Sequence, residues 1–267
     1  LINIFEYNDS DGLEQIFADN TNEISAIVLE PTVFEKPNPD FLKNVRKIAD
    51  QNDSLLILDE IVTGFRFDIG GAQKFFDIKG DLVCFGKGMG NGLPIAALTG
   101  PSEFMKSFDE LWVSSTNNCE ALSMAGTKAV INEMKEKNTI SHCWETGSIL
   151  FNEWNKITKE NNLNAKMTGY PVRMKIDCKN SKNENSESLK ALLLQEMVKK
   201  GIFFPPGQCF VSYSHSHDDI NMTLETLNDI CKEIVSKVSN DNYQKFLEGN
   251  IPQTVWTMKM PPTKKIK

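Results

Sequence analysis

The chain has 267 residues, of which 40% are hydrophobic and 24% are charged, and its formal net charge at pH 7 is -7. This composition is ordinary for a globular protein with a large core, and the acidic balance argues against a nucleic-acid-binding surface. No apolar run approaches the ~20 residues of a membrane-spanning helix, and no signal-like segment opens the chain. We therefore expect neither nucleic acid nor membrane among its partners.

The cysteines indicate a reducing compartment. Six are scattered along the chain without a CxxC pair, and several fall inside apolar patterns, where free thiols pack as small hydrophobic groups. A cytoplasmic location is therefore expected. The cysteines are Cys84, Cys119, Cys143, Cys178, Cys209 and Cys231.

The first predicted elements alternate between helix and strand. A short helix is expected to end near Asn20, and Ser25 to Leu29 predicts a strand. The prolines that follow predict a loop over residues 30–40. Asp40 is expected to cap a helix whose apolar stripe extends to Ala49, as in a helix that lies on a sheet.

Two further apolar runs end in chemically active side chains. Ser54 to Leu58 is too short for a helix and has the pattern of a strand covered on both faces, and it ends at Asp59. Leu82 to Phe85 is a similar run, and it ends at Lys87 among four glycines that permit close approach of a ligand. Ligands bind at the carboxyl ends of the strands in open α/β sheets, so Asp59 and Lys87 are expected to face one pocket.

The rest of the first half continues this rhythm. Residues 94–98 predict a strand beside the Lys87 strand, and the repeated βαβ pattern predicts an α/β large domain with a mostly parallel sheet and flanking helices. Residues 113–122 are expected to open a helix that runs to about Met134. The Ser/Thr cluster at its start offers hydroxyls and free backbone N–H groups that suit a phosphate, but from the residues alone a plain helix cap is the better explanation.

The second half predicts a smaller α+β domain. Helices are expected over residues 140–159, up to about Lys200 and over residues 218–238; strands are expected over residues 172–177, 202–204 and 210–213. The predicted division is 1–135 for part of the large domain, 136–240 for the small domain and 241–267 for a tail. His215-Ser216-His217 is better explained as a helix start than as a metal site, because zinc needs three or four protein ligands.

A lysine and an aspartate at neighbouring strand ends suit pyridoxal 5'-phosphate chemistry. The lysine amine forms a Schiff base with the cofactor aldehyde, and a carboxylate beside the pyridine nitrogen keeps it protonated, so the ring absorbs electrons from a substrate carbanion. Each residue alone has a simpler explanation. A lysine among glycines is usually a solvated loop residue, and an aspartate after a strand usually forms a turn.

DEIVTGFR at residues 59–66, followed by DLVCFGKGMGNGLPIAALTG at residues 81–100, resembles the class III, fold-type I, pyridoxal-phosphate-dependent aminotransferases. The similarity is strongest to the branch of glutamate-1-semialdehyde 2,1-aminomutase and its relatives. It extends through residues 26–31, 70–73, 201–206 and 215–224. The resemblance therefore covers nearly the whole chain.

The resemblance implies a role for each candidate residue. Lys87 is expected to be the Schiff-base lysine, Asp59 the partner of the pyridine nitrogen, and Ile61 the aliphatic residue on one ring face. Thr116 is expected to donate to the cofactor phosphate of the neighbouring subunit, so the protein is expected to be a homodimer. Glu35 is expected to reach the cofactor's phenolic oxygen or the substrate, although a solvated loop glutamate explains it equally well.

The implied activity is that of an aminotransferase or aminomutase, which moves an amino group on an amino aldehyde, amino acid or amino sugar. The alternative is a truncated or non-catalytic homologue that acts in assembly with a partner chain. In the family, a long N-terminal portion with a Gly/Ser-rich phosphate loop precedes the point that corresponds to Leu1. We therefore expect the 267 residues alone to bind the cofactor weakly.

Overall fold

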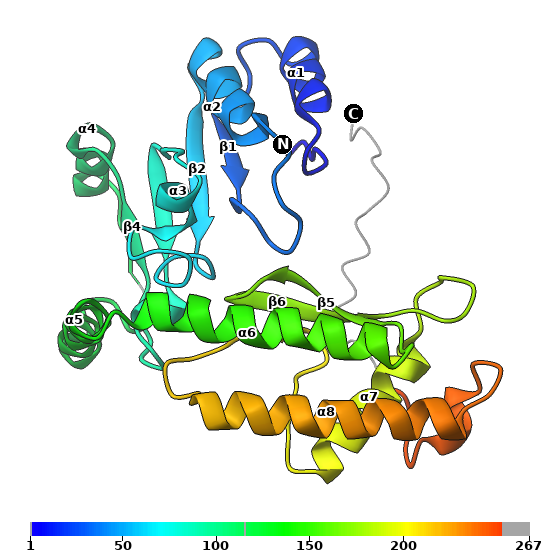
Figure 1. Ribbon diagram of the computed structural model, residues 1–267. Helices are drawn as coiled ribbons and strands as arrows, with labels where there is room; N and C mark the ends of the chain where they lie inside the picture. Colours follow the sequence, from blue (N-terminus) through cyan, green and yellow to red (C-terminus); the bar gives the residue numbers. More distant parts are fainter. Residues whose placement is uncertain (1, 115, 253–267) are drawn as a thin grey trace. The chain divides into compact units, whose positions relative to one another are not determined.

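The structure is a computed structural model that describes residues 2–114 and 116–252. The chain divides between Ile140 and Ser141 into two compact units, each with its own hydrophobic core (Figure 1). The first unit contains all five residues that the sequence identified as candidates for the site.

The first unit is built on a four-stranded sheet in the order β1-β2-β3-β4. The first three strands are parallel and β4 is antiparallel to β3, which confirms the predicted α/β class with a mostly parallel sheet. The strand that was expected beside the Lys87 strand is therefore present, although it is shorter than predicted. The strands are β1 Ala26–Leu29, β2 Leu55–Glu60, β3 Leu82–Phe85 and β4 Ala97–Thr99.

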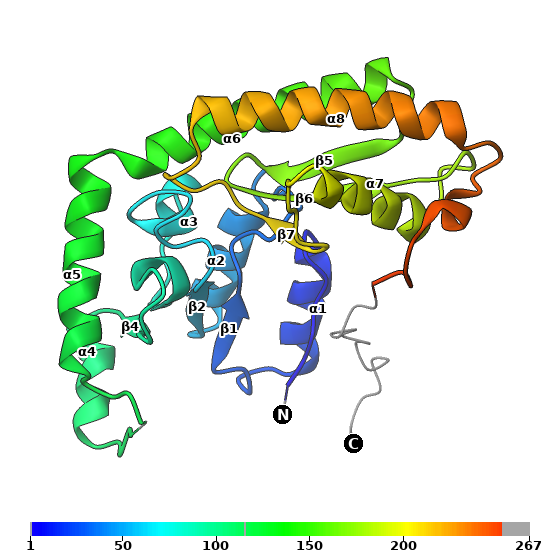
Figure 2. The same cartoon turned by 90° about the horizontal axis from the view of Figure 1, so that it is seen from below.

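Two helices, α1 Ser10–Asp19 and α2 Phe41–Gln51, lie alongside β1 and β2 in both ribbon views (Figures 1 and 2). The buried stripe of α2 packs with the alternate residues of β2 that are fully buried, including Leu56 and Leu58. The intervening residues of β2 are only half-buried. The prediction that this strand is covered on both faces is therefore wrong for the described residues, and Asp59 lies on the more open face.

Short helices follow the strands, and two predicted helix starts differ from the structure. Asp40 occupies the cap position of α2, but it is left-handed (φ 65°) and its side chain makes no capping bond. The helix expected from residues 113–122 begins only at Ala121, because residues 116–119 form a turn and the side chain of Glu120 caps the helix. The remaining helices are α3 Gly71–Phe75, η1 Lys87–Met89, α4 Ser102–Met105, η2 Lys106–Asp109 and α5 Ala121–Glu136.

The second unit has a three-stranded antiparallel sheet in the order β5-β6-β7, and its core includes the fully buried Trp154 and Leu193. The strands predicted at residues 202–204 and 210–213 are absent from the described structure, which has only the two-residue β7 between them. The elements are α6 Thr139–Glu160, β5 Ala165–Tyr170, β6 Arg173–Cys178, α7 Glu187–Lys199, β7 Gln208–Cys209, α8 His217–Lys237 and η3 Tyr243–Phe246.

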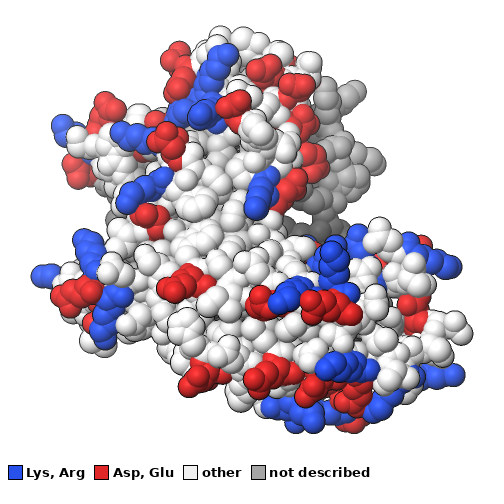
Figure 3. All heavy atoms as spheres, in the orientation of Figure 1, with Lys and Arg blue, Asp and Glu red and all other residues white. Residues whose placement is uncertain are grey.

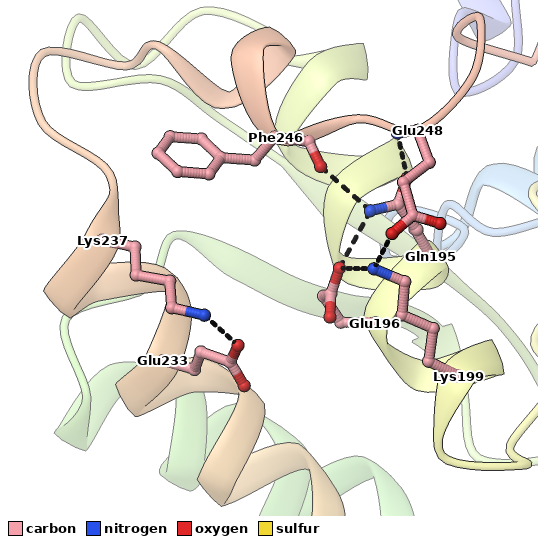
Figure 4. Close-up of polar contacts among 7 residues, drawn as sticks. All are labelled: Gln195, Glu196, Lys199, Glu233, Lys237, Phe246 and Glu248. Atoms are coloured by element: carbon pink, nitrogen blue, oxygen red, sulfur yellow. Dashed lines mark hydrogen bonds and ion pairs between the residues drawn. The ribbon is translucent and has the colours of Figure 1, made fainter.

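Side-chain contacts anchor the η3 segment on α7 (Figure 4). The amide of Gln195 donates to the carbonyl of Phe246 at 3.0 Å and accepts from the backbone N–H of Glu248 at 2.8 Å. Lys199 forms ion pairs with both Glu196 and Glu248. Because one amide satisfies two backbone groups, the chain after α8 is held on the second unit.

Acidic and basic side chains are interspersed on the face drawn in Figure 3. Within residues 2–114 and 116–252, none of the helices is long and apolar enough to cross a membrane.

Candidate active site

Lys87 follows β3 in a tight, constrained turn. Its backbone is left-handed (φ 43°), which is unfavourable for a residue with a side chain, and such conformations gather at functional sites. The turn is fixed by backbone bonds from Met89 N–H to the Gly86 carbonyl at 3.0 Å and from Asn91 N–H to the Lys87 carbonyl at 3.0 Å. Lys87 itself is exposed. The turn therefore presents the lysine at the carboxyl end of the strand.

Asp59 lies on the neighbouring strand, close to this turn. In the parallel register of β2 and β3 it is paired with Cys84, three residues before Lys87. Its carboxylate accepts the backbone N–H of Ile61 at 3.0 Å. Burial, and secondarily the charge of Asp59, raises the pKa of the Cys84 thiol. Asp59 is therefore near Cys84 on the more open face, at the sheet edge that Lys87 occupies.

Ile61 lies near the backbone on the N-terminal side of Lys87. A Cβ atom added at Gly86 would lie 3.5 Å from Cγ2 of Ile61, which is ordinary van der Waals contact. On the other side of Lys87, a Cβ atom at Gly88 would lie 3.8 Å from the carbonyl oxygen of Gly64. The structure thus brings Asp59, Ile61 and the Lys87 turn together.

Glu60 is a residue of this region to which the sequence analysis gave no role. It is fully buried, and its carboxylate accepts the N–H groups of Ala72 at 2.8 Å and Gln73 at 2.6 Å and the hydroxyl of Thr63. Burial raises its pKa, and these hydrogen bonds partly offset that rise. The sequence does carry a signal for this burial. Successive side chains of a strand point to opposite faces, so in β2 Glu60 points into the protein while Asp59 points to the more open face.

Thr116 is exposed in the turn before α5, so its hydroxyl is accessible. The amide groups at the start of α5 are not accessible in the same way, because Leu122 N–H and Ser123 N–H both donate to Glu120 at 2.7 Å. A hydrogen bond from the hydroxyl of Ser123 lowers the pKa of Glu120, and these two backbone bonds lower it further. These two N–H groups are therefore already paired within the chain.

Glu35 lies in the loop after β1 and is exposed. Its carboxylate accepts the side-chain amide of Asn8 at 2.9 Å, and its carbonyl accepts the hydroxyl of Thr32 at 2.7 Å. These contacts organise the loop that carries Glu35.

The metal hypothesis for residues 215–217 gains no support. The ring Nδ1 of His215 accepts the backbone N–H of Ser212 at 3.0 Å, and Ser216 forms a capping box with Asp219 at the start of α8. No group of three or more His, Cys, Asp or Glu suited to a metal occurs in the described part of the chain.

The donor set at the sheet edge fits one part of pyridoxal phosphate well. An exposed lysine for the aldehyde, a carboxylate on the adjoining strand for the ring nitrogen and an aliphatic side chain near the lysine turn match the needs of the ring. The phosphate has only Thr116 as a candidate among the predicted residues. The fold and the lysine–aspartate pair together define a fold-type I architecture of the pyridoxal-phosphate-dependent class.

Comparison with known proteins makes the family plain. The family model described as aminotransferase class-III matches residues 5–231, so the chain belongs to the class-III aminotransferase family. The predicted family and fold class are thereby confirmed.

Similar sequences include glutamate-1-semialdehyde 2,1-aminomutases. That of Alkaliphilus oremlandii is 31% identical over 247 residues, which cover 88% of this chain and 58% of that protein. That of Methanosarcina acetivorans is 30% identical over 235 residues, which cover 82% of this chain and 55% of that protein. The chain therefore spans little more than half the length of these relatives.

Solved structures share the fold at low sequence identity. The FumI protein of Sphingopyxis sp., in its PLP internal aldimine form, has a TM-score of 0.79 and 22% identity, with 88% of this chain and 57% of that chain covered. Glutamate-1-semialdehyde aminomutase from Pseudomonas aeruginosa PAO1 has a TM-score of 0.71 and 18% identity, with 87% and 56% covered.

Proposed function

We propose that this chain is the major part of a pyridoxal-phosphate-dependent aminotransferase or aminomutase whose cofactor is carried by Lys87. The observation that carries the proposal is the lysine–aspartate pair on adjacent parallel strands, Lys87 after β3 and Asp59 at the end of β2. Membership in the class-III aminotransferase family supports it. In this assignment residues 1–135 belong to the cofactor-binding domain and residues 136–240 to the small domain.

Each of the three residues at the carboxyl ends of β2 and β3 has its own role in this proposal. Lys87 supplies the amine that anchors the cofactor, and Asp59 holds a proton on the ring nitrogen. Ile61 packs on one ring face, beside the turn at Gly86, near which it already lies. The cofactor, when bound, supplies the electron sink that stabilises negative charge at the substrate carbon. Once the substrate amine has replaced it, the Lys87 amine is free to move a proton between that carbon and the cofactor's C4' atom.

The proposed substrate class is based on the names of similar proteins. The similar sequences are named as glutamate-1-semialdehyde 2,1-aminomutases, and one structural neighbour is named as an omega-transaminase. We therefore assign an amino aldehyde, an amino acid or an amino sugar as substrate, and either transfer between two molecules or a shift within one. Five free thiols support a reducing, cytoplasmic location: Cys84, Cys119, Cys178, Cys209 and Cys231.

The homodimer proposal rests on an exposed apolar segment that adjoins Thr116. Leu111 and Val113 are each 57% exposed and Trp112 is 93% exposed, and Leu122 at the start of α5 is 69% exposed. Apolar side chains gathered on one surface mark protein–protein contacts. A second copy would cover this segment, and Thr116 would then donate to the cofactor phosphate of that copy.

One observation favours the second candidate, a non-catalytic homologue that assembles with a partner chain. Glu120 satisfies the first amides of α5 with a carboxylate, where a phosphate would be repelled by its charge. Assembly through the exposed apolar segment requires no cofactor.

Amino-transfer activity separates the two candidates. The protein is saturated with pyridoxal phosphate and incubated with glutamate-1-semialdehyde or with an amino acid and an α-keto acid acceptor. We expect product that is lost in Lys87→Ala. A cofactor-saturated protein without any amino transfer would favour the assembly role.

A further inference from the structure

Glu60 joins both ends of the segment that follows β2. Near the start of that segment, its carboxylate accepts the hydroxyl of Thr63. At the end, it accepts the N–H groups of Ala72 and Gln73 in the first turn of α3. The side chain is fully buried. One carboxylate thus closes the loop formed by residues 61–70.

The space around Glu60 is shaped for this contact. Gly71 has a left-handed backbone (φ 82°), and a Cβ atom there would lie 2.5 Å from Oε1 of Glu60 and 2.6 Å from its Cδ. Real Cβ contacts are never this short, so only glycine permits α3 to reach the carboxylate. The link between Glu60 and α3 therefore depends on a glycine at position 71.

The loop held by Glu60 flanks Lys87 on both sides. Ile61 lies near Gly86, immediately before Lys87, and the carbonyl of Gly64 lies near Gly88, immediately after it: a Cβ atom added at either glycine would be in ordinary van der Waals contact with that neighbour. A Cβ atom at Gly64 would lie 2.5 Å from the ring of Phe85, the last residue of β3, so this approach is also tight. Phe85 also packs edge-to-face on Phe65, with ring centroids 5.5 Å apart. The loop is therefore packed on β3 at Phe85, two residues before Lys87.

We propose that Glu60 is a positioning residue for Lys87: by tying Thr63 and the start of α3 to the end of β2, it fixes the loop that holds the lysine turn. Glu60 acts through residues 61–64 and touches neither cofactor nor substrate. The inference rests on the proposed function of Lys87 as the cofactor-bearing residue, and it adds the element that sets the position of its backbone.

Glu60→Gln tests this contact with little change in volume. An amide offers one acceptor oxygen and one NH2 group, and the NH2 group cannot accept a hydrogen bond. In either orientation the amide therefore leaves one of the N–H groups of Ala72 and Gln73 without its acceptor. The substitution acts in the same way whether the wild-type carboxyl is ionised or protonated.

Asp81→Ala is the matched control. Asp81 also accepts a backbone N–H, that of Leu56 at 2.7 Å, and it lies at the opposite end of the same pair of strands. This variant removes a carboxylate anchor from the first unit without touching the loop of residues 61–70. A general loss of stability is thereby distinguished from a local effect at Lys87.

The measurement is hydrogen exchange of the full 267-residue chain, resolved to the amides of residues 89–91, which close the lysine turn. We expect Glu60→Gln to speed exchange at these amides about tenfold and Asp81→Ala to leave them unchanged while it speeds exchange at Leu56. Unchanged exchange at residues 89–91 in Glu60→Gln, or an equal increase in the control, overturns the proposal.

If Glu60→Gln does not fold, Thr63→Val decides the question, because it removes only the hydroxyl donor. Faster exchange at residues 89–91 in this variant supports the proposal, and no change there overturns it. Exchange needs no bound cofactor, so its outcome is independent of the proposed function. That function fails separately if reduction of the cofactor-loaded chain with borohydride labels a lysine other than Lys87.

Discussion

Gly71→Ala perturbs the contact between β2 and α3 directly. The backbone there is left-handed, which costs alanine about 1 kcal/mol. The added Cβ atom would also lie 2.5 Å from Glu60 Oε1, so the carboxylate must move away from its two backbone donors, Ala72 and Gln73. Loss of these two buried hydrogen bonds costs about 3 kcal/mol, so the free energy of unfolding of the first unit should fall by about 4 kcal/mol.

Gly92→Ala is the control in the same unit. Gly92 is also left-handed (φ 102°), but a Cβ atom there would meet nothing within 4 Å. It should therefore cost only the backbone term of about 1 kcal/mol. The assay is native-state hydrogen exchange of the slowest amides in β2, which report opening of the unit. Equal destabilisation by the two variants would refute the reasoning that Glu60 is held in place at Gly71.

Two further predictions concern charge. Asp59→Asn in the cofactor-binding protein should lose most of its amino-transfer activity and still bind some cofactor, because a neutral amide cannot hold the pyridinium proton; near-normal turnover contradicts this role. Burial raises the pKa of both Cys178 and Cys231 to about 12. When the pKa of a thiol is higher in the folded protein than in the unfolded chain, the thiol contributes stability. That contribution is complete below the pKa of the unfolded chain, and it is lost as the pH rises through the pKa of the folded protein. The free energy of unfolding of the second unit should therefore fall above pH ~9, by about 1.4 kcal/mol per pH unit for each thiol, and Cys231→Ala should reduce the slope; an unchanged slope in chemical denaturation disproves the assignment.

The sequence predicted those features of the fold that local patterns determine. The runs that became β2 and β3 are short, apolar and followed by glycine or acid, so their type and their parallel pairing could be inferred. The stripe of α2 and the capping box at Ser216 are equally local signals. The two-residue β7 could not be inferred, because its pairing depends on the position of β6 rather than on its own residues.

Some residues of the candidate site could likewise be predicted from the sequence, and others could not. Asp59, Ile61 and Lys87 follow from strand ends and from a family resemblance. The role of Glu60 depends on a buried hydrogen-bond network that closes over twelve residues, from Glu60 to Ala72, and periodicity carries no information on such a network. The capping of α5 by Glu120 was missed because the Ser/Thr cluster that precedes it is the commoner capping signal.

Borohydride reduction shows which lysine carries the cofactor. The chain is incubated with excess pyridoxal phosphate, reduced with borohydride and digested, and the labelled peptide is identified by mass spectrometry. Excess cofactor is required because weak binding is expected of the 267 residues alone. We expect the label on Lys87, and we expect this peptide to be unlabelled in Lys87→Ala. A label confined to any other lysine would show that Lys87 does not carry the cofactor.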